Sequence, residues 1–173
     1  MGERVETFLI PEIMRRLAPE PEEIWKIGKE AGGWQAWTGW SSDECHGTIH
    51  RNVSLDKFPH LIPEFIKEMP QWGNPEDSWI SMFVSDQDET NMGLGWHIDG
   101  YSVYGFNLEG ETVWEYFSPQ EGKIVEVKVG EMDRGIYMPC GITHRVRVTS
   151  ETRTSMSLVR AGKLNGQAVE FVK

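Results

Sequence analysis

Residues 92–106, "MGLGWHIDGYSVYGF", combine a strand-like pattern with two polar side chains. The stretch is rich in glycine and aromatic residues, which is typical of a buried β-strand and the turn beside it. It also contains His97 and Asp99, two polar groups that are costly to bury without a partner. Residues i and i+2 of a strand face the same way, so both side chains are expected to point in one direction.

From residue 78 onward the sequence is a series of short β-like runs separated by turns. Eight such runs at close spacing predict a sandwich or barrel and not alternating strand–helix units. The runs are residues 78–85, 95–99, 101–108, 112–118, 123–129, 135–139, 144–150 and 153–160.

Before residue 78 the pattern is helical. Residues 5–18 are roughly amphipathic, residues 19–32 place acidic groups early and lysines late, and residues 54–70 repeat apolar groups at helical spacing. Helices followed by strands predict an α+β, mainly β fold, a jelly roll with an N-terminal helical flank. We expect one domain, with the helical flank and a Trp-rich loop in 1–77, the jelly-roll core in 78–162 and a C-terminal tail in 163–173.

The composition indicates which partners and which cellular compartment to expect. The chain has 173 residues and a net charge of −10, which disfavours nucleic acid as a partner. A local basic groove around Arg145, Arg147, Arg153 and Arg160 is the alternative. No apolar run is long enough to span a bilayer, and the N-terminus matches neither a signal peptide nor a myristoylation site. Two cysteines, Cys45 and Cys140, make no disulfide framework, so we expect a cytoplasmic protein.

A third candidate ligand follows in "GIYMPCGITHRVRVTS", where His144 comes after a Pro-Cys-Gly turn. His97, Asp99 and His144 together would supply two imidazoles and one carboxylate on one face of a metal ion, an arrangement typical of non-haem Fe(II) oxygenases. A metal would satisfy the polar groups that the strand buries. An H-x-D pair alone is common and indicates metal binding only weakly. The distal histidine strengthens that interpretation, because histidine is scarce in this chain, with five in all.

The last run adds a second kind of group. Arg153, Ser155 and Ser157 fall on one face of that strand, whereas Met156 and Leu158 fall on the other. An inward arginine in a core strand needs an anion, and its planar guanidinium suits a carboxylate.

This combination resembles the Fe(II)/2-oxoglutarate-dependent dioxygenases, which fold as a double-stranded β-helix, a jelly roll of the cupin superfamily. The resemblance covers residues 78–160. It implies that His97, Asp99 and His144 are the catalytic iron ligands, and that Arg153 and Ser155 bind the distal carboxylate of 2-oxoglutarate. It also implies an oxygenase that hydroxylates an unactivated C–H bond and releases succinate and CO2.

One stretch departs from part of that family. JmjC-like members usually anchor 2-oxoglutarate with a lysine on the strand after H-x-D, where this chain has Thr112 in "GETVW". Arg153 is therefore the expected anchor, and Thr112 and Asn107 are expected to assist it. Tyr101 and Tyr104 lie near enough in sequence to support the ligands, and packing roles stay equally open for them and for Asn107.

Several alternatives stay open. The runner-up is a metal-dependent cupin of another class, a 2-oxoglutarate-independent oxygenase or an isomerase, and the third is a jelly-roll module that binds an anionic ligand without catalysis. The Trp34, Trp37 and Trp40 stretch favours a packing wall over an aromatic platform, and Cys45, His46 and His50 lack a fourth ligand for a second metal site. We expect a small-molecule or peptide substrate, no membrane partner, and a helical flank that offers a surface for a homodimer.

Overall fold

The computed structural model describes residues 4–36, 45–46, 48–68, 78–85, 93–161 and 169–171. Its helices are α1 (Glu12–Leu17), α2 (Pro21–Glu30) and α3 (Ile62–Glu68), with a 3-10 turn, η1, at Leu55–Lys57. Its central strands are β5 (Ser78–Ser85), β7 (His97–Asp99), β8 (Tyr101–Glu109), β9 (Thr112–Ser118), β10 (Lys123–Val129), β11 (Arg134–Met138), β12 (Thr143–Val148) and β13 (Arg153–Ala161). The remaining strands are β1 (Glu6–Leu9), β2 (Gln35–Ala36), β3 (Cys45–His46), β4 (Thr48–Val53), β6 (Gly93–Leu94) and β14 (Val169–Phe171).

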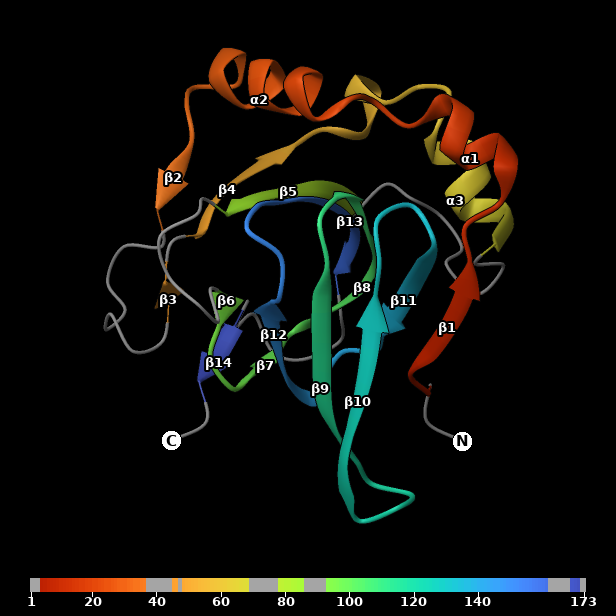
Figure 1. Ribbon diagram of the computed structural model, residues 1–173, viewed down its shortest axis with the longest axis vertical. Helices are drawn as coiled ribbons and strands as arrows, with labels where there is room; N and C mark the ends of the chain where they lie inside the picture. The colour runs from red at the N-terminus through yellow and green to blue at the C-terminus, as the bar shows by residue number, and fades with distance from the viewer. Residues whose placement is uncertain are drawn as a thin grey trace.

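Two antiparallel sheets form the jelly roll (Figure 1). The larger has the order β1-β11-β8-β13-β5-β4-β2, and the smaller has the order β10-β9-β12-β7-β14. A two-stranded ribbon pairs β3 with β6. All eight predicted β-runs are strands of these sheets, so the predicted mainly β jelly roll is confirmed.

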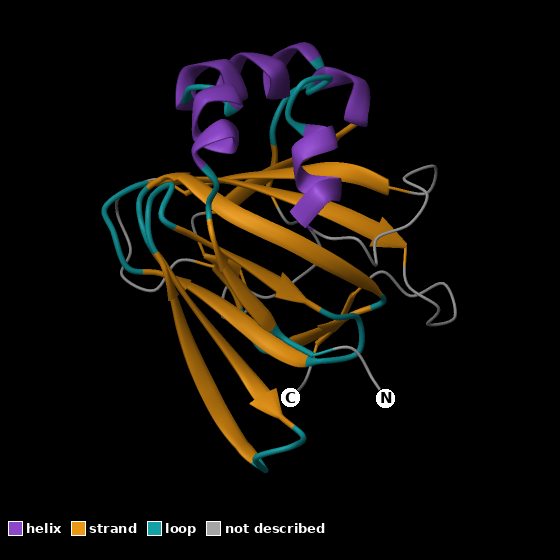
Figure 2. Ribbon diagram, turned by 90° about the vertical axis from the view of Figure 1, so that its right-hand side faces the viewer, coloured by secondary structure: helices purple, strands orange, loops and turns teal. Residues whose placement is uncertain are grey.

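The helices lie together on the outer face of the larger sheet (Figure 2). Side chains alternate along the sheet strands, and one set packs under the helices: Ile80, Met82, Tyr104, Phe106, Met156 and Leu158. The other set faces the second sheet and includes Val103 and Val159. The interior between the sheets is therefore a separate compartment from the core beneath the helices.

Two predicted helical stretches are wrong in part. Residues 6–9 form β1, because Phe8 pairs opposite Gly135 on β11 and its ring stacks on Tyr104 with centroids 4.2 Å apart. Helix α1 starts only after Pro11. In residues 54–70 the helix is interrupted, since Pro59 disfavours helical backbone at Phe58, and α3 begins at Ile62.

The predicted helix in residues 19–32 is confirmed as α2. Pro21 stands at its first turn, and the Glu23 carboxylate accepts a hydrogen bond from the Glu20 N–H at 3.0 Å, which satisfies a donor at the helix start. At the other end, Arg51 of β4 donates to the Ala31 carbonyl. Trp34 packs on Trp25 with ring centroids 5.4 Å apart.

The β structure also extends past the expected core. Strand β4 lies in the stretch read as a Trp-rich loop and pairs with β5 along its whole length. Strand β14 lies in the stretch read as a tail, where Val169 pairs with Asp99 and Phe171 with His97. Trp34 confirms the packing interpretation of the tryptophan stretch, whereas Trp37 and Trp40 lie outside the described residues. None of the helices in the described ranges is long and apolar enough to cross a membrane.

Candidate metal centre

The three predicted ligands meet in the interior between the sheets. Strands β7 and β12 pair so that His97 lies opposite His144, with ring centroids 4.3 Å apart. Asp99, two residues along β7, faces the same way. His97 Nε2 lies 3.6 Å from Asp99 Oδ1 and His144 Nε2 lies 3.5 Å from Asp99 Oδ2. One ligand atom from each side chain falls within 4.8 Å of the others, and all three residues are buried.

Both imidazoles are oriented in the same way by the backbone. His97 Nδ1 is 2.7 Å from the Gly95 carbonyl oxygen, and His144 Nδ1 is 2.9 Å from the Ile142 carbonyl oxygen. A carbonyl only accepts, so each Nδ1 carries the hydrogen and each Nε2 presents a lone pair toward Asp99. Fixing the tautomer through the second ring nitrogen is the usual arrangement of metal-ligating histidines.

The electrostatics of the cluster suit a cation. Burial lowers the pKa of His97 to about 4 and that of His144 to about 3, with the neighbouring His97 a further cause for His144. Burial also raises the pKa of Asp99 to about 8, opposed by a hydrogen bond from Tyr101. Within the described part of the chain, Asp99 Oδ1 accepts no hydrogen bond. A divalent cation would satisfy this buried oxygen and the two converging Nε2 atoms, so the donor set fits a metal such as Fe(II) or Mn(II).

Aromatic side chains support two of the ligands. The Trp114 ring stacks on His144 at 5.8 Å between centroids and 11° between planes. Of the two roles left open for Tyr101, the structure favours support of a ligand, because its hydroxyl donates a hydrogen bond to Asp99. For Tyr104 it favours the packing role. Its side chain points to the opposite face of β8 and packs against Phe65 beneath the helices.

A pocket extends from the triad between the sheets. The space between its walls is about 710 Å³, a figure that includes the open mouth. Apolar walls come from residues such as Phe83, Val146 and Val159. Every residue predicted to bind metal or cofactor lines this pocket: His97, Asp99, Asn107, Thr112, His144, Arg153 and Ser155.

Arg153 occupies a part of the pocket rich in hydroxyl groups. Its Nη1 donates to Ser155 Oγ at 3.0 Å, and its Nη2 donates to Ser85 Oγ at 2.8 Å and to Thr48 Oγ1 at 3.3 Å. The guanidinium carbon lies 5.5 Å from the centre of the Phe83 ring. Arg153 is 5% exposed. The predicted inward arginine is therefore an interior cation held in place by hydroxyl groups.

Thr48 and Ser85 are site residues that the sequence interpretation missed. Thr48 begins β4, which was read as part of a loop, and Ser85 ends β5 beside Arg153 in the register. Their hydroxyls lie 2.9 Å apart. Only the alternation of Ser81, Phe83 and Ser85 along β5 could have indicated the inward face, because serine and threonine carry no motif of their own.

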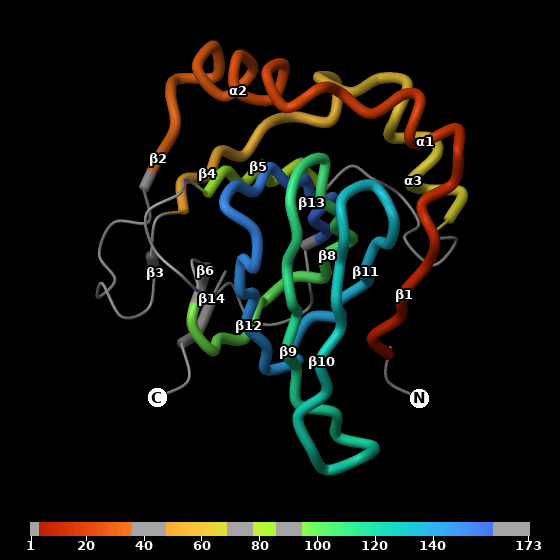
Figure 3. Tube along the Cα trace, viewed as in Figure 1, coloured from red at the N-terminus to blue at the C-terminus, as the bar shows by residue number. Residues whose placement is uncertain are grey.

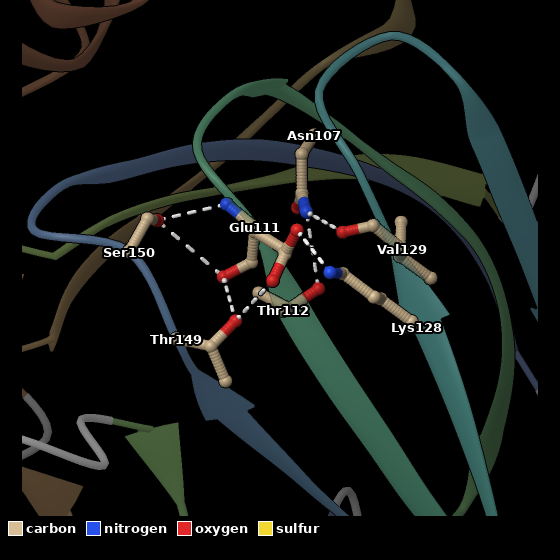
Figure 4. A network of polar contacts seen from close by, with 7 residues as sticks. All are labelled: Asn107, Glu111, Thr112, Lys128, Val129, Thr149 and Ser150. Carbon is tan, nitrogen blue, oxygen red and sulfur yellow. Dashed lines mark hydrogen bonds and ion pairs between the residues drawn. The ribbon is translucent and has the colours of Figure 1, made fainter.

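Asn107 and Thr112 form a polar link in the same pocket (Figure 4). Asn107 Nδ2 donates to Thr112 Oγ1 at 3.1 Å and to the Val129 carbonyl at 2.9 Å. Asn107 pairs with Ser155 across β8 and β13, so this link lies beside the Arg153 end. Nearby, the carboxylate of Glu111, the residue before Thr112, contacts Lys128 Nζ of β10 at 2.9 Å.

Two of the four arginines considered for a local basic groove are neutralised by one carboxylate. Arg145 and Arg147 both donate to Glu115, a residue that is 5% exposed, and Arg153 lies in the interior. Arg153 therefore does not share an exposed surface with Arg145 and Arg147. His60 is exposed, and His50 lies against the Gln35 carbonyl at 3.2 Å, whereas the side chains of Cys45 and His46 lie outside the described residues.

Comparisons with known proteins give structural neighbours alone. No family model matches the sequence, and no curated protein matches it. Oxalate decarboxylase from Bacillus subtilis at pH 4.6 is similar at 15% identity with a TM-score of 0.52, over 77% of this chain and 31% of that one. A chain from the study of the DMSP lyases RdDddP and RnDddQII is similar at 8% identity with a TM-score of 0.53, over 82% of this chain and 62% of that one.

The likeness concerns architecture, since both identities are low. The chain spans about a third of the length of the oxalate decarboxylase chains and less than two thirds of the lyase chain. Another match is to the Mn(II)-containing Bacillus subtilis oxalate decarboxylase, with a TM-score of 0.52. The two antiparallel sheets, the enclosed pocket and these neighbours together establish that the chain has the cupin fold.

Proposed function

We propose that the protein is a metal-dependent enzyme that binds a small carboxylate between the triad and Arg153, and specifically an Fe(II)/2-oxoglutarate-dependent oxygenase. The observation that carries the proposal is the presence of two complementary groups in one pocket. Asp99 and two oriented histidines offer a metal site, and Arg153 offers an interior cation held by hydroxyl groups. A dicarboxylate that chelates a metal at one end requires both.

Each protein group has a defined part in this proposal. His97, Asp99 and His144 would hold Fe(II), which with 2-oxoglutarate supplies the oxygen-dependent chemistry that hydroxylates a C–H bond. Arg153 and Ser155 would bind the distal carboxylate.

Thr112 would donate the remaining polar contact. Its oxygen accepts from Asn107, and no acceptor for its own hydrogen is present among the described residues. In this proposal that hydrogen would bond to an oxygen of the ligand. Asn107 orients Thr112 and contacts the cofactor only through it.

A second candidate is a cupin enzyme that needs no 2-oxoglutarate and acts directly on a small carboxylate. The structural neighbours favour it, because oxalate decarboxylase and the DMSP lyases are named for small carboxylate substrates. In this case Arg153 would hold the substrate itself. A module that binds an anion without a metal is the third reading, and the converging Nε2 atoms argue against it.

An anaerobic titration of the metal-free protein with Fe(II), followed by 2-oxoglutarate, tests the proposal. Chelation of iron by a keto acid gives a weak visible charge-transfer band. We expect that band in the wild type, its loss in His97→Ala, and its appearance only at higher 2-oxoglutarate concentration in Arg153→Ala. The exposed residues His60 and Arg16 provide matched controls, His60→Ala and Arg16→Ala, which should behave as wild type.

The alternatives predict other results. Tight iron binding with no band at any 2-oxoglutarate concentration would move the direct carboxylate chemistry to first place, to be followed by turnover assays with oxalate and related acids. Failure to bind Fe(II) or Mn(II) would leave only the metal-free module.

A further inference from the structure

A second pocket lies on the same inner face of β9 as the first. Thr112 and Trp114 line the pocket that contains the triad, whereas Tyr116 and Ser118 line the second. These four residues alternate along one strand and so face the same way. Tyr116 is the cross-strand partner of His144, so the second pocket begins beside a metal ligand.

The second pocket lies away from the Arg153 end. Thr112 lies at the Arg153 end of the first pocket, where it is bonded to Asn107. From Thr112, strand β9 runs past Trp114 to Tyr116, which pairs with His144 of β12, and then to the β9–β10 hairpin. The hairpin projects beyond the body of the molecule (Figure 3). Ile142, which accepts the Nδ1 hydrogen of His144, forms another wall. The second pocket and the carboxylate site therefore lie on opposite sides of His144 along β9.

The walls combine apolar surface with two opposite charges. Val5, Ile142 and the Tyr116 ring supply apolar contact, while Arg4 and Glu121 supply a cation and an anion. Arg4 and Glu121 line one pocket without pairing with each other in the described part of the chain, and the Glu121 carboxylate contacts Lys123 Nζ at 2.8 Å. Glu121 and Tyr116 line the same pocket, and burial raises the pKa of Tyr116, with the charge of Glu121 as a second cause.

We propose that the second pocket binds the substrate and that the substrate is a free α-amino acid. Its carboxylate would pair with Arg4 and its ammonium group with Glu121, beside the face of Tyr116, a favourable position for a cation. Its side chain would then extend past Ile142 toward the triad. The space between the pocket walls, its opening to solvent included, is about 560 Å³.

This inference rests on the proposed function in one respect, that a metal occupies the triad. Other substrate classes fit less well. The Glu121 carboxylate and a net charge of −10 oppose a phosphorylated ligand, and the charged walls oppose a lipid chain.

Proton NMR of amino acids in the presence of the protein and Mn(II) tests the proposal. Mn(II) at the triad accelerates the relaxation of nearby protons, so it reports both binding and proximity to the metal. We expect enhanced relaxation that is strongest at the side-chain end of the amino acid, and affinity roughly 10- to 100-fold lower in Arg4→Gln and in Glu121→Gln. Glu126→Gln and Arg16→Gln change the same charges outside the pocket and should bind as wild type.

Chemical analogues separate the two contacts. In the wild type, the amino acid amide should bind more weakly than the free amino acid, and Arg4→Gln should weaken the binding of the amide little further. In the same way, the N-acetyl amino acid should bind the wild type more weakly, and Glu121→Gln should weaken its binding little further. Lys123 pairs with Glu121 at 2.8 Å, so Lys123→Gln should strengthen the binding of the ammonium group.

The outcomes distinguish this proposal from the proposed function. If Mn(II) and 2-oxoglutarate bind but no amino acid does, the substrate proposal is overturned and the cofactor assignment stands. If Mn(II) fails to bind, saturation-transfer NMR without metal still measures amino acid binding and its dependence on Arg4 and Glu121. Equal binding of the amino acid, its amide and its N-acetyl form would contradict the two-charge recognition. Preferential binding of a peptide over the free amino acid would contradict the substrate class.

Discussion

The guanidinium of Arg153 is fixed on the hydroxyl of Ser85, to which its Nε and Nη2 donate at 3.2 and 2.8 Å. A lysine cannot reproduce this two-nitrogen contact, because it carries a single ammonium group on a flexible chain. The geometry of the fork, and not the positive charge alone, therefore determines how a carboxylate would be held.

Arg153→Lys is expected to weaken 2-oxoglutarate binding by roughly 10- to 100-fold, the range for a lost charge-assisted hydrogen bond. Ser85→Ala keeps the arginine but removes its support, and should weaken binding by about 2- to 10-fold. Fe(II) affinity should stay unchanged in both, because neither residue contacts the triad. Isothermal titration under anaerobic conditions measures both affinities, and unaltered 2-oxoglutarate affinity in Arg153→Lys would refute the assignment of Arg153.

Divalent metal is expected to stabilise the folded protein through the triad. Binding to the native state alone adds about 2.7 kcal/mol at a free metal concentration 100 times Kd, which is a rise in Tm of roughly 5–10 °C for a chain of this size. The wild type should show this rise with Mn(II) or Fe(II) and lose it on addition of a chelator. His144→Ala should show none, whereas His60→Ala should respond as wild type; a full rise in His144→Ala would place the metal elsewhere.

Gly135 is expected to tolerate no side chain. A Cβ at this position would lie 1.7 Å from Cζ of Phe8, the residue that stacks on Tyr104. Gly135→Ala should therefore displace β1 and lower the free energy of unfolding by about 1–3 kcal/mol, the usual cost of overpacking. Gly130→Ala is the matched control, since its Cβ would meet only Asp133 at 3.7 Å. Urea denaturation measures both, and equal stability of the two variants would contradict the close contact.

The sequence was informative where short-range patterns determine structure. Alternation along residues 153–160 predicted which side chains face inward, and the pairing of β7 with β12 brought His97 and His144 together as expected. Strand β1 was missed because residues 6–9 are strand-like only through their pairing with β11, more than a hundred residues away. Thr48 and Ser85 were missed for a related reason, since a hydroxyl group gains a role in the site only when β4 and β5 bring it to Arg153.

Glu115 is expected to give the stability of the fold a dependence on pH. A hydrogen bond from Arg145 is the main cause that holds the pKa of Glu115 below its usual value. Burial opposes this shift, and a hydrogen bond from Arg147 adds to it. A carboxyl whose pKa is lower in the folded state stabilises the fold above its unfolded pKa of about 4.3, and this contribution is lost as the pH falls through the folded pKa. Arg145 Nη2 donates to it at 3.0 Å and Arg147 Nε at 2.8 Å, so the pairs join β9 to β12.

Glu115→Gln should therefore be less stable than wild type by about 1–3 kcal/mol at pH 7, and the difference should shrink as the pH is lowered below 4. Glu126→Gln is the control on the neighbouring strand, because Glu126 is largely exposed and lies 3.6 Å from Arg147, a surface pair worth little. Urea denaturation between pH 3 and pH 7 gives both differences. Gln has nearly the same shape as Glu, so the substitution tests the charge, and a loss of stability that is the same at every pH would show that the charge of Glu115 is not its cause.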